Sequence, residues 1–186
     1  MFGDEHYILM DINLFSYEFP QPVGWLGIAD SGGEITRVIF NLRPDELYGI
    51  ATQRLFSMQI IYKGAELVIC KSELNSRAAA QLEEYFDGRR PAFDLPLRMD
   101  GPAFTKSVYR ELLNIPPGQT RSYKEIAVAC GNPRAYRAVG MANNKNPIPI
   151  IVPCHRVIGS DGGLTGYAGG LEFKRYLLDL ENRCYI

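Results

Sequence analysis

Short apolar stretches alternate with turn residues in the first half of the chain, a pattern that predicts a mixture of strands and helices. The stretches 25–30 and 34–40 flank a Ser-Gly-Gly turn at 31–33, which predicts a β-hairpin. Pro44 predicts the first turn of a helix over 44–56.

A further helix is predicted over 77–86, where alanines and apolar residues recur. Ser76 precedes it as an N-terminal cap, and Gly88 follows it as glycine follows many helices. Prolines and a glycine interrupt the stretch 89–101, which has little periodicity and therefore predicts a linker.

The second half of the chain is predicted to be mostly helical. Apolar residues share one face of 105–115, and a Pro-Pro-Gly stop follows that helix. Ser122 can cap a helix over 123–130, with Glu125 as half of a capping box. A tight Gly-Asn-Pro turn then leads into a helix over 134–143. The two helices form a helix-turn-helix pattern, which is common both in DNA-binding proteins and in ordinary bundles.

Small side chains line one face of the helix predicted over 134–143. Ala135, Ala138 and Ala142 share this face, and Gly140 adds no bulk. A helix is about 10–12 Å across and the minor groove of B-DNA about 6 Å wide, so only a bare helix face could press into that groove. The same alanines could instead pack against the preceding helix.

The composition is that of an ordinary globular protein, since 46% of the residues are hydrophobic and 22% are charged. No run of about 18 apolar residues could cross a membrane, and the acidic N-terminus lacks the basic start of a secretory signal. We therefore expect a protein that is not secreted. The four cysteines are far apart and form no C-x-x-C pair, so free thiols are expected and no metal site is predicted.

The formal net charge of −1 hides a basic segment. Residues 101–159 contain eight basic and two acidic side chains, and so carry a charge of +6. Such a segment suggests a local anionic partner, although a solvated surface would show the same pattern.

A cysteine and a histidine stand side by side where an apolar run ends. Pro153 favours an extended Val152, which places Cys154 just beyond a strand end. His155 would then need a water or a turn to reach the thiol. An ordinary thiol is only about 3% ionised at pH 7, so a lower pKa would increase the fraction of thiolate by ~25-fold at most. Positioning of the substrate and protonation of the leaving group must supply the rest of the rate acceleration. A buried structural cysteine beside a core histidine is the plain alternative.

The glycine-rich loop 159–170 is flexible enough to shape a pocket. It lacks the Lys-Ser/Thr pair of a phosphate-binding loop, so binding of nucleoside triphosphates is not predicted. A helix is predicted over 171–180, with Glu181 near its end, where it could orient the histidine.

The motif Pro-Cys-His-Arg-Val at 153–157 resembles the signature of the O6-alkylguanine-DNA alkyltransferases, the methylated-DNA–protein-cysteine methyltransferases. The resemblance covers about 103–181 in the expected order and spacing. It includes further matches at 122–123, 131–133, 137–140, 146–147, 167–170 and Glu181. The first ~95 residues resemble the N-terminal domain of the family only in size and loose pattern.

The resemblance implies an α+β fold with two domains. Residues 1–95 would form an α/β domain with an antiparallel, ribonuclease H-like sheet. Residues 96–186 would form a mostly helical, winged-helix-like domain that contains the helix-turn-helix and transfers the alkyl group. It implies no cofactor, and the cysteine and histidine ligands of the zinc-carrying relatives are not found here.

The resemblance also implies roles at the reaction centre. Cys154 would accept the alkyl group, His155 would take the thiol proton through a water, and Glu181 would hold the imidazole. Tyr123 would donate toward the departing guanine, and Asn146 would brace the turn before the active-site strand. The alkylguanine pocket would be lined by Tyr167, Ala168, Gly169 and Val157.

For DNA, the resemblance implies that Arg137 enters the duplex in place of the extruded base, with Tyr136 near the rotated phosphate. The alanine face, including Ala138, would dock in the minor groove. Further DNA contacts would come from Thr105, Lys124, Asn132 and Ser160.

The implied function is DNA repair by stoichiometric, self-inactivating transfer of an alkyl group to Cys154 from O6 of guanine, and also from O4 of thymine. The partner would be double-stranded DNA containing O6-alkylguanine, bound by a monomer in the cytoplasm of a prokaryote or the nucleus of a eukaryote. A non-enzymatic helix-turn-helix protein that senses lesions or regulates genes is the alternative. A Cys-His hydrolase unrelated to DNA would leave Arg137 and the basic segment unexplained.

Overall fold

The computed structural model describes residues 11–47 and 67–185 of the chain. The predicted hairpin is present in it: β2 (Gly24–Ser31) pairs antiparallel with β3 (Glu34–Phe40). Gly32 and Gly33 form the turn with φ of 59° and 78°, values that other residues rarely adopt.

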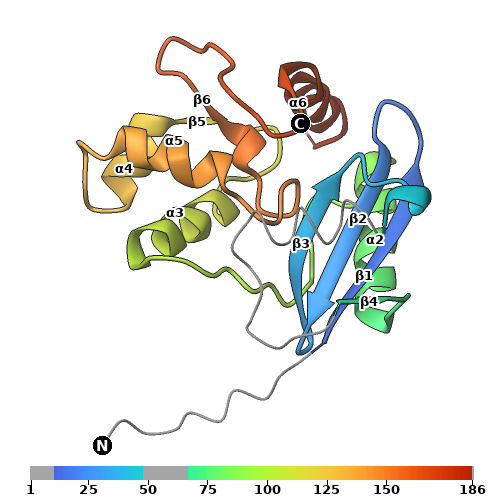
Figure 1. Ribbon diagram of the computed structural model, residues 1–186. Helices are drawn as coiled ribbons and strands as arrows, with labels where there is room; N and C mark the ends of the chain where they lie inside the picture. The colour runs from blue at the N-terminus through green and yellow to red at the C-terminus, as the bar shows by residue number, and fades with distance from the viewer. Residues whose placement is uncertain (1–10, 48–66, 186) are drawn as a thin grey trace, which may run out of the picture.

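The described strands of the main sheet lie in the order β3-β2-β1-β4 (Figure 1). β1 (Ile12–Phe19) is antiparallel to β2, whereas the short β4 (Leu67–Ile69) runs parallel to β1 at the edge. The predicted α+β class is confirmed, and the sheet is antiparallel except for this edge strand.

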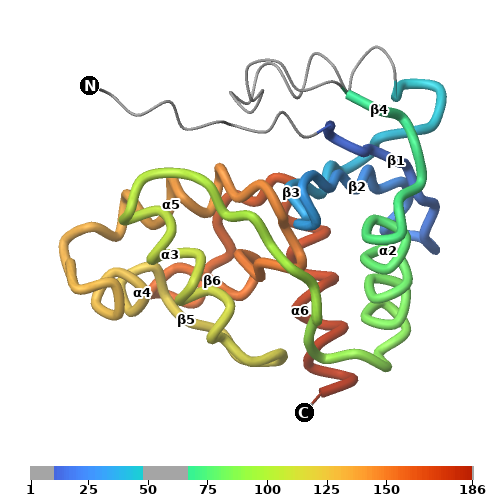
Figure 2. The backbone as a smooth tube through the Cα atoms, turned by 90° about the horizontal axis from the view of Figure 1, so that it is seen from below, coloured from blue at the N-terminus to red at the C-terminus, as the bar shows by residue number. Residues whose placement is uncertain are grey.

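α2 (Glu73–Phe86) packs against the sheet, as both views show (Figures 1 and 2). It begins four residues before the predicted start, because its cap is Ser72 and not Ser76. The Ser72 hydroxyl accepts the Asn75 N–H, and the Asn75 side chain accepts the Ser72 N–H, which completes a capping box. The helix ends before Gly88, as predicted.

The helix predicted over 44–56 starts as a short 3-10 helix, η1 (Pro44–Glu46), and its remainder lies mostly outside the described residues. The linker 89–101 is irregular, as predicted, but it is tied to the sheet. The Ile35 N–H donates to the Pro96 carbonyl (2.8 Å), and the Arg98 N–H donates to the Ile35 carbonyl (2.9 Å). The linker therefore extends the edge of the sheet beside β3.

The second half contains α3 (Ala103–Leu113), α4 (Tyr123–Ala129), α5 (Tyr136–Asn144) and α6 (Leu171–Tyr185). The predicted capping box of Ser122 and Glu125 starts α4. α5 starts two residues later than predicted, because the Gly-Asn-Pro turn continues until the Ala135 N–H donates to the Asn132 carbonyl. Two short parallel strands, β5 (Arg121–Ser122) and β6 (Val157–Ile158), join the start of α4 to the Cys-His motif.

The strand predicted before Cys154 is wrong. The apolar run 148–152 forms a fully buried turn in which Ile150 has a φ of 74° and the Val152 N–H donates to the Ile148 carbonyl. Pro149 and Pro153 have no N–H to donate along a sheet ladder, and the pairing in this stretch is a single bridge between Pro149 and Val152. Cys154 instead opens a 3-10 helix, η2 (Cys154–Arg156).

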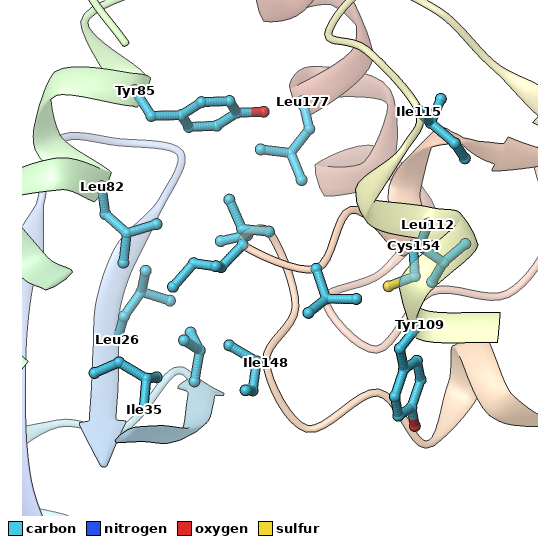
Figure 3. Close-up of a cluster of buried hydrophobic side chains, with 14 of the residues drawn as sticks. Leu26, Ile35, Leu82, Tyr85, Tyr109, Leu112, Ile115, Ile148, Cys154 and Leu177 are labelled. Carbon is cyan, nitrogen blue, oxygen red and sulfur yellow. The ribbon is translucent and has the colours of Figure 1, made fainter. Parts of the chain in front are cut away.

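A single large hydrophobic cluster joins the two halves of the chain. Leu26 and Ile35 from the sheet and Leu82 from α2 belong to it together with Leu112 from α3 and Leu177 from α6 (Figure 3). α6 lies between α2 and the group of α3, α4 and α5 (Figure 2). Among the helices of the described part, none has the length and apolarity that a membrane crossing requires. The division at residue 95 stays a prediction.

Candidate active site

Cys154 is held by one buried asparagine side chain. Asn146 Nδ2 donates to the Val152 carbonyl (2.8 Å) and to Cys154 Sγ (3.2 Å), while its Oδ1 accepts the Ile148 N–H (3.1 Å). These hydrogen bonds fix the buried turn that leads into the cysteine. Cys154 itself is only 5% exposed.

His155 and Arg156 both point at Glu181, which projects from the buried face of α6. His155 Nε2 lies 2.9 Å from Glu181 Oε1, and the Arg156 guanidinium bonds both carboxylate oxygens at 2.8–3.1 Å. A carboxylate can only accept, so the imidazole carries its proton on Nε2 and has a lone pair on Nδ1. That Nδ1 is buried and has no hydrogen-bond partner within the described protein.

Burial and neighbouring charges determine the protonation states of Glu181, His155 and Cys154. Burial would raise the pKa of Glu181, but the hydrogen bonds and charges of His155 and Arg156 outweigh it and hold that pKa far below its usual range. Burial lowers the pKa of His155 despite the nearby carboxylate. Burial also raises the pKa of the Cys154 thiol to about 11. At neutral pH the site therefore holds a protonated thiol, a neutral imidazole and an ionised carboxylate.

The structure also contains an open pocket of about 540 Å³, which Cys154, His155 and Glu181 do not line. It lies between α4, α5 and the glycine-rich loop, and it is lined by Tyr123, Lys124, Tyr136, Gly140, Asn144, Ser160, Thr165 and Gly166. The Tyr123 hydroxyl accepts a hydrogen bond from Thr165 Oγ1 (2.9 Å), so its own hydrogen is free to point into the pocket.

A buried lysine connects the pocket to the turn that carries the cysteine. Lys174 Nζ donates to the carbonyls of Val157 (2.6 Å) and Thr165 (3.1 Å). Burial lowers the pKa of this ammonium group. Our sequence analysis missed Lys174, although its spacing to Leu177 and Glu181 places all three on the buried face of α6.

None of the four residues predicted to line the alkylguanine pocket lines this open pocket, and Gly169 lines a separate one beside Phe40 and Phe173. The Tyr167 ring meets His155 edge-on at 6.5 Å, and its hydroxyl is buried without a partner in the described structure. Gly169 lies against Phe40 and Phe173, Val157 is buried, and Ala168 is exposed.

The residues predicted to contact DNA divide between the pocket and its surroundings. Tyr136, Lys124 and Ser160 line the pocket itself. Arg137 is exposed on α5, and its guanidinium lies 5.8 Å from the Tyr136 ring. Asn132 is exposed in the turn before α5, and Thr105 is partly buried at the start of α3.

The alanine face of α5 serves two environments. Ala142 is buried in the core, whereas Ala138 and Gly140 remain partly exposed. Met141 on the same helix is 61% exposed, and the sequence analysis did not single it out. The packing explanation therefore holds for Ala142, and the rest of the face remains accessible.

The four cysteines are all free thiols. Within residues 11–47 and 67–185, no three His, Cys, Asp or Glu side chains are grouped so that they could hold a metal ion.

Comparison with families and curated proteins gives consistent matches. The family described as 6-O-methylguanine DNA methyltransferase, DNA binding domain, matches residues 103–183. A methylated-DNA–protein-cysteine methyltransferase of Methanosarcina barkeri is 65% identical over 104 residues, which cover 56% of this chain and 66% of that protein. One from Methanosarcina acetivorans is 57% identical over 112 residues, or 60% of this chain and 72% of that protein. The matched segments thus span about two thirds of these relatives.

Solved structures extend the similarity over most of the chain. The crystal structure of Mycobacterium tuberculosis OGT in complex with DNA matches with a TM-score of 0.74 and 39% identity, covering 92% of this chain and 93% of that one. The O6-methylguanine-DNA methyltransferase of Pyrococcus kodakaraensis matches with a TM-score of 0.66 and 26% identity, covering 91% and 98%.

Proposed function

The chain belongs to the methylated-DNA–protein-cysteine methyltransferase family, and from this membership we propose that it repairs DNA by moving an alkyl group from O6 of guanine to Cys154. The observation that supports the assignment of Cys154 most directly is its position beside a neutral imidazole. Glu181 Oε1 accepts the hydrogen bond from His155 Nε2, which leaves His155 Nδ1 with a lone pair that can accept a proton.

The proposed step is a substitution at the alkyl carbon. The thiol sulfur forms a bond to this carbon while the bond from the carbon to O6 breaks, and the electron pair of that bond stays on guanine. His155 Nδ1 takes the thiol proton through a water, and Tyr123 gives its hydroxyl proton to guanine, which leaves as the neutral base. The proton held by His155 then returns to Tyr123 through water, so that overall the thiol loses one proton and guanine gains one. Because the thiol pKa is about 11, the proton must leave as sulfur attacks.

Tyr123 is the proposed donor to the leaving base. It lines the pocket, and its hydroxyl hydrogen is not used by Thr165. A donor placed where negative charge develops lowers the barrier to departure. This help is needed because the site does not supply a preformed thiolate.

We propose that the exposed part of α5 docks in the minor groove, with Arg137 replacing the extruded base. The pocket lies against this helix, and Tyr136 and Lys124 at its rim are accessible. Extrusion is required because a base inside the duplex cannot reach a buried thiol. The ribonuclease H-like and winged-helix-like details of the fold, and a location in the cytoplasm, also belong to this proposal.

The product, a thioether, is not cleaved by water, so each molecule is proposed to act once. We propose that the same reaction removes an alkyl group from O4 of thymine, where the alkyl carbon is likewise bonded to an exocyclic oxygen of the base. Both points extend the proposal beyond its central reaction.

Mass spectrometry tests the proposal directly. After incubation with a duplex containing O6-methylguanine, the peptide with Cys154 should gain one methyl group, and the gain should saturate at one equivalent. Cys154→Ala should abolish transfer and keep DNA binding, whereas Cys184→Ala, which removes an exposed thiol, should transfer normally. Binding without any gain in mass would favour the lesion-sensing alternative, and repeated turnover would contradict single use.

A further inference from the structure

One residue of the first half of the chain reaches the histidine–glutamate pair. Tyr85, near the end of α2, is fully buried, and its hydroxyl donates to Glu181 Oε1 at 2.7 Å. Figure 3 shows its ring extending from α2 with the hydroxyl directed toward Leu177 of α6. This contact connects residues that are 96 positions apart, and none of the roles assigned above uses it.

The carboxylate oxygen that Tyr85 contacts is the one that holds the imidazole. Oε1 accepts from Tyr85, from His155 Nε2 (2.9 Å) and from Arg156 Nη2 (2.8 Å). Oε2 accepts the Gly118 N–H (3.1 Å) and Arg156 Nε (3.0 Å). Donors to one carboxylate compete for its negative charge, so each weakens the hold of that charge on the others.

Tyr85 can act only as a donor in this position. Burial and the charge of Glu181 raise the pKa of its hydroxyl well above its usual value, so the hydroxyl keeps its hydrogen. Its ring is held between aromatic neighbours, with ring centres 5.4 Å from Phe93 and 6.4 Å from Tyr185. The hydrogen bond is therefore a permanent part of the site.

We propose that Tyr85 is a positioning residue of the alkyl-transfer site: by donating to Glu181 Oε1 it limits the attraction between that carboxylate and His155, and so keeps the imidazole free to accept the thiol proton. The proposal rests on the proposed function in one respect, that His155 is the proton acceptor. It places a control of the reaction in α2, outside residues 103–183, which the family model matches.

The other charged and titratable groups around the Tyr85–Glu181 hydrogen bond come from η2, α6 and the loop before α6. Arg156 and Cys154 come from η2, Lys174 and Tyr185 from α6, and Tyr167 from the loop before α6. Replacement of Tyr85 by phenylalanine leaves all of them in place. A difference between the two proteins therefore reports the hydroxyl alone.

Tyr85→Phe tests the proposal through the dependence of the rate on pH. Without the competing donor, Glu181 stabilises a protonated His155 more strongly, so the pKa of the imidazole should rise by about 0.5–1 unit. A protonated imidazole cannot accept the thiol proton. The acid limb of the single-turnover rate should therefore move to higher pH by the same amount, while the rates above that limb agree within about twofold.

Tyr185→Phe is the matched control. The Tyr185 hydroxyl donates to the Tyr85 and Arg90 carbonyls and does not reach Glu181, so its loss removes support from the end of α2 without changing the relay. This variant should lose stability and keep the acid limb of the parent protein. Incorporation of 3-fluorotyrosine at position 85 provides a variant that keeps the side-chain shape. Its more acidic hydroxyl donates more strongly and should move the acid limb to lower pH.

Titration of the histidine ring by nuclear magnetic resonance separates this proposal from the proposed function. The chain has two histidines, His6 and His155, so the signals can be assigned with one substitution. An unchanged His155 titration together with an unchanged acid limb in Tyr85→Phe would reduce Tyr85 to a structural role and overturn the proposal. Failure of the parent protein to transfer alkyl groups would overturn the proposed function, and the His155 titration would still decide the role of Tyr85.

Discussion

Cys154 and His155 both sit where burial disfavours charge, and that shared environment determines how the site can react. Burial keeps the proton on the thiol and keeps the imidazole neutral, and Arg156 adds to the second effect by balancing the charge of Glu181. A buried carboxylate that lost this partner would be costly, by about 3–5 kcal/mol. The site therefore stores no reactive thiolate, and the thiol is protected from adventitious reactions until a substrate arrives.

The buried thiol should also affect stability at alkaline pH. The folded protein holds the Cys154 proton up to a pKa of about 11, whereas the unfolded chain releases it at its lower, ordinary pKa. The stabilisation is complete below the unfolded pKa and is lost as the pH rises toward 11. Cys154→Ala should therefore lose less free energy of unfolding between pH 8 and pH 10 than the parent does, by roughly 1–2 kcal/mol.

Urea denaturation at several pH values measures this difference. Cys184→Ala is the control, because the Cys184 thiol is exposed and its removal should leave the alkaline slope unchanged. If the free energy of unfolding fell equally steeply with pH in Cys154→Ala and in the parent, the thiol of Cys154 would not be shielded from solvent.

At the residue scale the sequence predicts what is contiguous and misses what packing assembles. Cys154 and His155 stand together in one motif, and Glu181 follows at the end of a periodic helix. Tyr85, a tyrosine near a helix end, carried no such signal. The spacing of Lys174 to Leu177 and Glu181 indicated a buried face of α6, but it did not indicate what a lysine there would bind. The contact of Tyr85 with Glu181 exists because α2 reaches α6 in the fold, and the contact of Lys174 with the Val157 carbonyl exists because α6 lies against β6.

The start of α4 is the element on which the pocket depends most. Tyr123 is the first residue of this short helix. The hydroxyl of Ser122 before it accepts the Glu125 N–H, and the Ser122 N–H donates to the Glu125 carboxylate, which closes the capping box. A seven-residue helix has little stability of its own, so its cap and its packing decide whether it forms. The position of the Tyr123 hydroxyl therefore depends on Ser122.

Replacing this cap should weaken both the fold and the site. Ser122→Ala should lower the free energy of unfolding by about 1 kcal/mol and slow alkyl transfer, because the first turn of α4 frays and Tyr123 loses its fixed position. Ser107→Ala is the matched control, since the Ser107 hydroxyl donates within α3 to the Phe104 carbonyl and caps nothing. Chemical denaturation and single-turnover rates measure the two effects; equal losses in both variants would contradict the role of the cap.

At the element scale the capping signals were partly sufficient. Ser122 was assigned correctly because its partner Glu125 lies at the expected spacing. Ser72, the actual cap of α2, was not recognised: its partner three residues later is Asn75, whereas a capping box usually has glutamate or glutamine there. The strand before Cys154 was mispredicted because a continuous apolar run fits a buried turn as well as a strand, and only the left-handed Ile150 distinguishes them.

Over the whole molecule, positive charge is concentrated in the part of the sequence that also forms α4 and α5. The segment 101–159 carries +6 in a chain of net charge −1, and Lys124 lies exposed on the pocket rim. Phosphate contacts made by such side chains release counterions, so affinity for DNA falls as salt rises. The basic segment is therefore expected to supply affinity without sequence preference.

Salt titrations of binding to an undamaged duplex test this distribution. Lys124→Gln should weaken binding and reduce the slope of log affinity against log salt by about 1, as expected for one lost phosphate contact. Lys71→Gln removes an exposed lysine beside the main sheet, over the Phe15 ring, and should leave the slope unchanged. Equal slopes for Lys124→Gln and the parent protein would place DNA elsewhere on the surface.

The hydrophobic cluster that runs from Leu26 through Leu82 to Leu177 has a practical implication for engineers. A chimera that takes its first half from one relative and its second half from another would bring together two surfaces that did not evolve together. The junction between these surfaces would lie within the hydrophobic core. Such exchanges should succeed only when α2 and α6 are transplanted as a pair from the same parent.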